Sequence, residues 1–176
     1  MLIAEALSEI KLIEKKIQSK HEAVMRYLVR DESYRDPLTR EGGSSEYVKR
    51  ELQATDDLEK RRVALRTGIN RTNLEAVIEI DSERLTVAEW LSWRREVATA
   101  RALRLKGIAQ TVIQARSQAM QRRVTSATQI IDTKMEIAIS VDESWLTKEI
   151  QHLDTVVQDL DGKLSLFNAT VQVNGI

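Results

Sequence analysis

The chain has no cysteine and a single proline among its 176 residues. Without cysteine it forms no disulfide and offers no thiolate to a metal, and the scarcity of proline leaves room for long helices. Aromatic residues make up only 4% and there are six glycines, a composition that favours helices over a β-sandwich or barrel. No apolar run approaches the ~18 residues that span a bilayer, so we expect no membrane partner.

The chain also has no excess charge of either sign, because 27 Lys and Arg balance 27 Asp and Glu. Proteins that bind nucleic acid usually carry a strong positive field, so this balance argues against nucleic acid as a partner. Near the start, Glu5 and Glu9 interrupt the apolar run that a signal peptide needs. We therefore expect synthesis in the cytoplasm.

Apolar residues at helical spacing predict four long helices, over residues 2–30, 44–72, 86–123 and 145–167. In the first of these helices, apolar residues recur every seven positions, as in a heptad seam. These residues are Ile3, Ile10, Ile17 and Val24. The fourth helix has the most regular 3-4 spacing, and we expect its apolar side to face the first or the third helix. Its apolar residues are Leu146, Ile150, Leu153, Val157, Leu160, Leu164 and Phe167.

Polar residues mark the starts of these helices. Ser44 or Ser45 can cap the second helix, and Asp142 or Ser144 the fourth. The third helix begins with the spacing of a capping box, in which the Thr86 hydroxyl and the Glu89 carboxylate each accept a hydrogen bond from a backbone amide.

Two stretches alternate apolar and polar residues and are predicted to be strands. Residues 76–86 form a hairpin with a turn at Asp81–Ser82, and residues 134–141, "KMEIAISV", form a strand that pairs with it. Val171 and Val173 mark a short edge strand near the end of the chain. We therefore predict one domain over residues 1–176 that is mainly α with a small β element. It would be an antiparallel hairpin or bundle of long helices with heptad-like seams, plus a two- or three-stranded antiparallel sheet.

Between the first two helices, residues 31–45 form a long connection that contains Pro37 and a Gly42–Gly43 pair. We favour a mobile loop there over an ordered arm that docks on a partner. If the loop is an arm, its apolar and aromatic residues are the candidate contacts. These are Tyr34, Pro37 and Leu38.

The third helix is basic and the fourth is acidic. Residues 87–123 contain eight basic and two acidic residues, which leaves +6, whereas residues 142–161 contain six acidic residues and one lysine, which leaves −5. We expect the two helices to pair, within one molecule or across a subunit boundary, which favours protein–protein contact over nucleic acid or membrane. Three arginines and two tryptophans near the start of the third helix are candidate partner contacts, although packing of the tryptophans (Trp145 included) on the small sheet is favoured. These candidates are Trp90, Trp93, Arg94, Arg95 and Arg101.

The residues that usually carry catalysis or bind metal are almost absent. The two histidines, His21 and His152, lie on different predicted helices with no His or Cys at ligand spacing. The "DLDG" at residues 159–162 resembles the start of a calcium loop, but the rest of that loop is missing. We therefore predict no catalytic, cofactor-binding or metal-binding residue, and a protein that is not an enzyme.

Several stretches resemble known proteins. "IAEALSEIKLIEKKIQ", "INRTN" with "LTVAEWL", and "LDGKLSLFNATVQV" resemble the septicolysin-like family of small helical proteins, which implies a helical fold without an assigned biochemical role. "RDPLTREGGSSEYVKRE" with "WLSWRREV" is similar to uncharacterised proteins of tailed bacteriophages, often near capsid genes. Both resemblances are compatible with a structural role.

The leading hypothesis is a non-enzymatic structural or assembly protein associated with a phage virion, as a capsid cement or minor structural protein that bridges neighbouring subunits. Its partners would be other copies of itself, capsid proteins or other virion proteins. The alternative is a free cytoplasmic, homo-oligomeric helical adaptor of the septicolysin-like type. The third hypothesis is a nucleic-acid-associated packaging protein that uses the arginines between Arg94 and Arg123.

Overall fold

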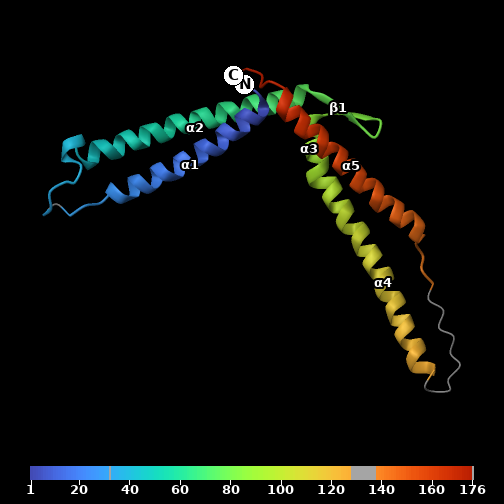
Figure 1. Cartoon of the computed structure of the whole chain (residues 1–176). Coiled ribbons are helices and arrows are strands. Elements are labelled where there is room, and N and C mark those ends of the chain that lie inside the picture. Colours follow the sequence, from blue (N-terminus) through green and yellow to red (C-terminus); the bar gives the residue numbers. More distant parts are fainter. Residues whose placement is uncertain (32, 128–137, 176) are drawn as a thin grey trace. The chain divides into compact units, whose positions relative to one another are not determined.

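The computed structural model describes residues 1–31, 33–127 and 138–175, and it is mainly α-helical with one small antiparallel sheet (Figure 1). The side chains of residues 122–127 lie outside the description. The fold class predicted from the sequence is confirmed. Where the sequence predicted one domain, the chain divides into two compact units. The first unit is Met1–Val77 with Leu164–Ile176, and the second is Ile78–Lys163.

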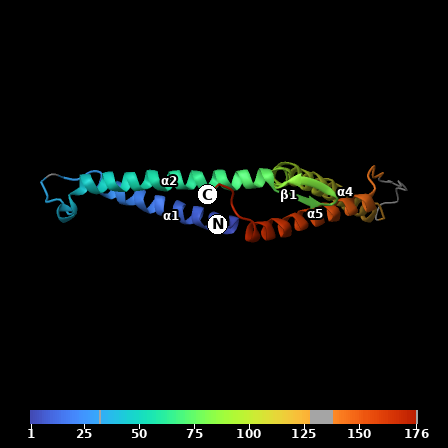
Figure 2. The same ribbon diagram turned by 90° about the horizontal axis from the view of Figure 1, so that it is seen from above.

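The first unit is a hairpin of two long helices, α1 (Ile3–Tyr27) and α2 (Ser44–Glu75), which lie side by side (Figures 1 and 2). The predicted heptad residues of α1 face inward: Ile3, Ile10 and Val24 are buried and Ile17 is half-buried. The hairpin therefore has a core one side-chain layer thick. The other buried apolar residues along it are Ala6, Ile13, Leu65 and Ile69.

The end of the chain closes this hairpin at the start of α1. The Val173 N–H donates to the Met1 carbonyl at 2.9 Å, and the Ile3 N–H donates to the Val171 carbonyl at 3.0 Å. Between these bonds, Leu2 and Gln172 form a single antiparallel bridge. The predicted edge strand is therefore reduced to one bridge, although Val173 is buried as an inward-facing strand residue would be.

The predicted hairpin consists of β1 (Val77–Ile80) and β2 (Glu83–Thr86), and all of it except Val77 belongs to the second unit. The turn residues Asp81 and Ser82 both have positive φ, 51° and 66°, which suits a two-residue hairpin turn. The capping box is also confirmed: the Glu89 N–H donates to the Thr86 hydroxyl at 3.2 Å, and the Thr86 N–H donates to the Glu89 carboxylate at 2.8 Å. The hairpin and the helix that follows are thus joined without an intervening loop.

The third predicted helix is one continuous helical stretch with a change of winding inside it. It consists of α3 (Val87–Ser92), a π-helical turn η2 (Trp93–Ala98) and α4 (Thr99–Ala127). Within this turn, the Thr99 hydroxyl donates to the Arg94 carbonyl at 3.1 Å. The helical stretch covers the predicted range of 86–123, but the π-helical turn was not predicted.

The prediction of a third strand over residues 134–141 is wrong for its described residues. Residues 138–141 have no strand structure, and residues 134–137 of that prediction lie outside the described residues. In the described part of the chain the sheet is two-stranded. Ile139 and Val141 are only half-buried, so their alternation with polar residues does not correspond to packing on a neighbouring strand. The Asp142 carboxylate then accepts from the Ser144 N–H at 2.8 Å and starts the next helix, as predicted.

The fourth helix, α5 (Glu143–Thr170), packs in the second unit against α4 and η2. Leu146 and Leu153 form a buried cluster with Ala98 and Leu105, and Trp93 packs against it. All seven apolar positions predicted for α5 are buried or half-buried, which confirms its regular 3-4 pattern. Lys163 ties this helix to the sheet, because its Nζ donates to the Glu79 carbonyl at 2.5 Å.

Replacing Leu153 with alanine should destabilise the protein by about 2–5 kcal/mol, because the leucine is 3% exposed and its loss leaves a cavity between α4 and α5. The control is Leu166→Ala on the same helix, where the side chain is 65% exposed and little burial is lost. Chemical denaturation monitored by circular dichroism measures both. Equal stability of the Leu153→Ala variant and the wild type would contradict this packing.

Candidate functional site

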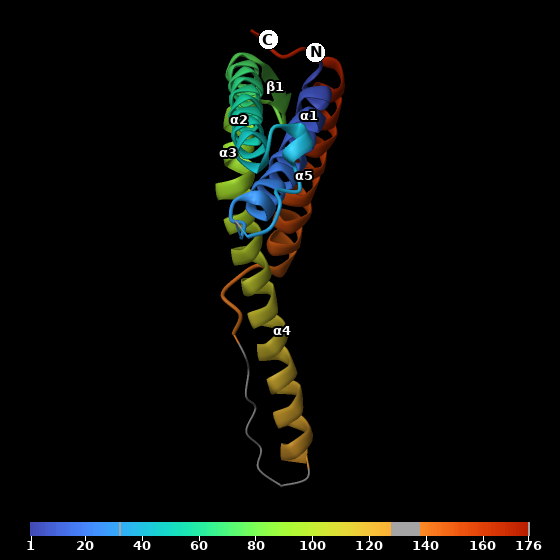
Figure 3. The same cartoon turned by 90° about the vertical axis from the view of Figure 1, so that its left-hand side faces the viewer.

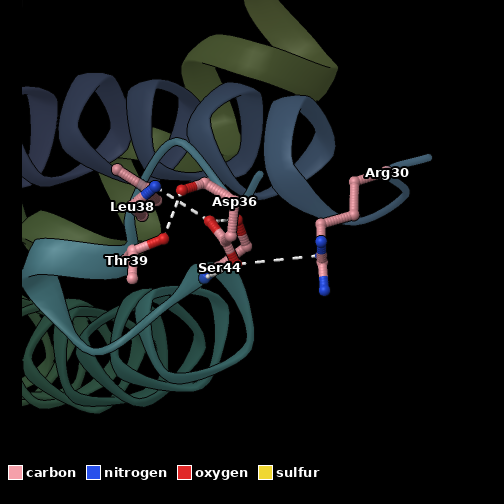
Figure 4. A network of polar contacts seen from close by, with 5 residues as sticks. All are labelled: Arg30, Asp36, Leu38, Thr39 and Ser44. Carbon is pink, nitrogen blue, oxygen red and sulfur yellow. Dashed lines mark hydrogen bonds and ion pairs between the residues drawn. The ribbon is translucent and has the colours of Figure 1, made fainter. Parts of the chain in front are cut away.

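The connection between α1 and α2 is organised by one carboxylate, that of Asp36 (Figure 4). It accepts hydrogen bonds from the Leu38 N–H, the Ser44 N–H and the Ser44 hydroxyl, each at 2.8 Å. The Arg30 guanidinium lies 3.7 Å from it, and the Asp36 carbonyl accepts from the Thr39 hydroxyl at 2.5 Å. These bonds come from within the chain, so the order of this loop needs no neighbour.

Asp36 is a residue that the sequence analysis missed. Helix α2 was expected to be capped by Ser44 or Ser45, but Gly43 precedes the helix at φ 88° and Ser44 is its first residue. The acceptor for the first amide comes from Asp36, eight residues earlier. The bonds from Ser44 and Leu38 hold the pKa of the Asp36 carboxyl below its usual value. Ordinary capping rules look one to three residues back and do not find such a partner.

The three loop candidates differ in exposure. Tyr34 is 74% exposed and Pro37 is exposed, whereas Leu38 is half-buried. The end of α1 adds further exposed apolar side chains, with Leu28 at 55% and Val29 at 84%. The tip of this hairpin therefore presents apolar surface on a loop that its own hydrogen bonds hold in place.

The tryptophan candidates are used within the chain's own core. Trp90 is 1% exposed, and its indole N–H donates to the carbonyl of Ile78 in β1 at 3.1 Å. Trp93 is half-buried and meets Trp90 edge to face, with ring centroids 5.4 Å apart. The expected packing on the small sheet is thus confirmed for Trp90, whose side chain is not accessible to a partner. Trp145 departs from this expectation, because it is 47% exposed.

The basic and acidic helices pair within one molecule. Pairing within a molecule and pairing across a subunit boundary were the two expected alternatives. Arg94 of η2 lies 2.8 Å from Asp161 of α5. Further along, Arg101 pairs with Glu149, and Arg116 pairs with Glu143 at the first residue of α5. Arg95 instead pairs with its neighbour Glu96 at 2.7 Å and stays exposed. Surface ion pairs contribute only about 0–1 kcal/mol each, but they favour one antiparallel register of the two helices.

Helix α4 continues beyond the point where α5 begins (Figures 1 and 3). The ion pair of Arg116 with Glu143 marks the start of α5, and α4 runs on to Ala127. In the described part of the second unit no helix lies opposite this end. Near it, Ile113 and Met120 are 66% and 72% exposed. This end of α4 is a second apolar surface, which sequence periodicity alone did not reveal.

One ion pair lies in the seam between α1 and α2. Lys20 occupies a position where the heptad pattern calls for an apolar residue, and its Nζ lies 2.7 Å from the Glu51 carboxylate. Their side chains are 27% and 15% exposed. A polar pair in an apolar seam typically fixes the register of the helices, so we interpret this pair as a structural element.

The remaining polar residues give no enzyme-like arrangement in the described ranges. His152 Nε2 lies 3.2 Å from the Asp81 carboxylate with both side chains about half exposed, and His21 is exposed. Among residues 1–31, 33–127 and 138–175, no three His, Cys, Asp or Glu side chains gather as a metal site. The "DLDG" stretch is helical, inside α5. None of the helices in this part of the chain is both long and apolar enough to cross a membrane.

Comparisons with known proteins add no relative. No protein-family model, no curated protein and no solved structure matches this chain. The resemblances to septicolysin-like and tailed-phage proteins therefore stay expectations from the sequence.

Replacing Asp36 with alanine should open the 31–45 loop and lower the melting temperature, because the α2 amide loses its acceptor. In acid, the loop of the wild type should open in the same way, because the Asp36 carboxyl becomes protonated. A carboxyl whose pKa is lowered on folding stabilises fully above its unfolded pKa of about 3.9, and this contribution is lost as the pH falls below that value. Limited proteolysis of the loop measures the opening at each pH.

The control for this experiment is Asp31→Ala. Among the described residues, the Asp31 carboxylate accepts bonds within its own turn, from the Ser33 N–H and hydroxyl, so this variant should be cut much more slowly than Asp36→Ala. Equal rates of cleavage for the wild type and Asp36→Ala would show that the carboxylate does not hold the loop.

Free nucleic acid should not bind the protein tightly, because Arg94, Arg101 and Arg116 are each paired with a carboxylate and the chain has no net charge. Fluorescence anisotropy with labelled duplex and single-stranded DNA, at physiological salt and micromolar protein, should show no saturable binding. A salt-sensitive, submicromolar complex that is lost when Arg94, Arg95 and Arg101 are replaced by alanine would contradict this expectation.

Proposed function

We propose that this protein is a non-enzymatic structural protein that acts by assembly, joining copies of itself or neighbouring subunits through exposed helical surfaces. The observation that carries the proposal is the end of α4, which runs past the Arg116–Glu143 ion pair. Met120 lies beyond that pair and Ile113 about one turn before it, and both are largely exposed. Helical stability in proteins comes mostly from the packing of an apolar face on other elements. A neighbouring subunit that covers this end would supply packing that the described part of the chain does not.

The ionisable groups support a structural role. Four described carboxyls have a pKa lowered by a hydrogen bond: Glu9 by Arg61, Asp31 by the hydroxyl of Ser33, Asp36 by the amide of Ser44, and Glu89 by the amide of Thr86. The Glu9 contact joins α1 to α2, the Asp31 contact lies within one turn, and the other two hold amides at the starts of helices. Hydrogen bonds that lower a carboxyl pKa in this way stabilise the folded state. The pKa of a catalytic group, in contrast, is usually shifted by desolvation in a cleft.

The resemblance to tailed-phage proteins makes a virion lattice the setting of this proposal, as a cement or minor structural protein. A free homo-oligomeric adaptor would use the same surfaces outside a particle. Mass spectrometry of purified particles distinguishes the two settings, because only the first places the chain in the particle at a fixed ratio to its other subunits.

Purified protein should form species larger than its 20.1 kDa monomer at micromolar concentration, which size-exclusion chromatography with light scattering measures. The double variant Ile113→Gln with Met120→Gln should shift the distribution toward the monomer, because it removes apolar surface from the end of α4. The matched control is Val97→Gln with Leu103→Gln, two exposed side chains on the stretch that pairs with α5. A wild type that stays monomeric throughout this range would overturn the proposal.

A further inference from the structure

The outer side of α2 carries a shallow, open hollow of about 500 Å³. Val63 and Ala64 form its apolar part, and Val63 is 60% exposed. Its remaining lining residues are Asp56, Glu59 and Lys60. The residues at 56, 59, 60 and 63 follow the i, i+3, i+4, i+7 spacing, so they share one surface of the helix.

The charge around this hollow is negative. Asp56 and Glu59 form no ion pair or hydrogen bond with other described side chains, whereas the Lys60 amine already lies 3.7 Å from Asp57. The hollow therefore presents two carboxylates without an ion pair among the described residues, next to an exposed valine and beside the Lys60 amine.

The outer side of α1 has the opposite character. Lys11 and Lys15 are exposed, one helical turn apart, and they have no acidic partner among the described residues. Leu12 lies between them in the sequence and is 52% exposed. Two like charges at this spacing repel each other, and an acidic partner would reduce this electrostatic repulsion.

These two surfaces do not meet within one chain. Helices α1 and α2 face each other through buried residues such as Ile10, Ile13 and Leu65, and through the ion pairs of Glu9 with Arg61 and Lys20 with Glu51. The exposed residues Leu12 and Val63 lie outside that seam. A basic surface flanked by an exposed leucine and an acidic hollow lined in part by Val63 and Ala64 are complementary, and every copy of the chain carries both.

We propose that the occupant of the α2 hollow is a second copy of this chain, docked through the outer side of its α1. Leu12 of one copy then packs over Val63 and Ala64 of the other, and the Lys11 and Lys15 amines pair with the Asp56 and Glu59 carboxylates. The inference rests on the proposed function, since it names one surface by which copies join.

This contact is heterologous, because the two sides of the interface are different surfaces. Each copy offers its α1 surface to one neighbour and its α2 hollow to another, so the contact repeats from copy to copy. Such an interface produces a ring if its rotation closes and a filament if it does not. Either product would place the hairpins in a row, as a protein that bridges subunits requires.

The test uses two charge-reversed variants of the full chain: Lys11→Glu with Lys15→Glu, and Asp56→Lys with Glu59→Lys. Each variant alone places like charges across the contact, so the concentration at which it assembles should rise at least about tenfold in sedimentation velocity at physiological salt. An equimolar mixture of the two variants should assemble again, because each acidic surface then meets a basic one. Lys106→Glu with Lys148→Glu makes the same change in net charge as the Lys11 and Lys15 variant, on exposed lysines of the second unit, and should assemble as the wild type does.

The outcomes separate this inference from the proposed function. Recovery in the mixture, with loss in each variant alone, supports the docking of a second copy. Wild-type assembly that neither variant weakens, or a mixture that stays dissociated, overturns the inference and leaves the proposed function intact. A monomeric wild type overturns both. Far-ultraviolet circular dichroism of each variant, expected to be unchanged, shows that loss of assembly is not loss of fold.

Discussion

The constraint on which this structure depends is that two paired helices can bury only the stripe that each presents to the other. In the first unit that stripe contains Ile3, Ile10 and Ile13 from α1 and Leu65 and Ile69 from α2, while side chains on the outer sides such as Leu12 and Val63 are exposed. In the second unit the small sheet packs at one end, where Trp90 reaches the Ile78 carbonyl. Among the described residues, each paired helix is therefore packed on one side only. The caps at Asp36 and Thr86 and the hydrogen bonds between the two chain ends add stability that this one-sided packing does not supply.

Charge has two roles in such an arrangement. Residues beside a seam form pairs across it, as Arg94 does with Asp161 and Glu9 with Arg61, and these pairs favour one register. Farther from a seam, Lys11 and Asp56 have no such partner among the described residues. The net charge of the chain is zero because both sets balance, so composition alone cannot distinguish them. Only the position of each residue relative to the seam shows which charges are available to another molecule.

Periodicity made most of the fold predictable, and it failed where the controlling contact is distant in sequence. The 3-4 spacing located the helices because each turn repeats the same burial, and the Thr86–Glu89 capping box was found because its partners are three residues apart. The cap supplied by Asp36 could not be found in this way. The alternation before Asp142 suggested a strand because apolar spacing records side-chain polarity but not whether a neighbouring strand exists. Of the candidate contacts, Trp90 packs on the small sheet as the sequence favoured, whereas Trp145, for which the same packing was expected, is 47% exposed.

The two surfaces proposed for assembly differ in physical character, and this difference matters for how copies would join. The end of α4 is apolar, so its burial is strengthened by salts that are excluded from protein surface. The α1 and α2 surfaces combine a small apolar contact with unpaired charges, so their attraction is screened as ionic strength rises and the Debye length falls below about 10 Å. An assembly that uses both surfaces would therefore respond to salt in two opposing ways. The charged contact would govern the rate of encounter and the orientation of the copies, and the apolar contact would govern the lifetime of the complex. A chain with no net charge is suited to this division, because copies approach without long-range repulsion while local surfaces of opposite sign still select the partner.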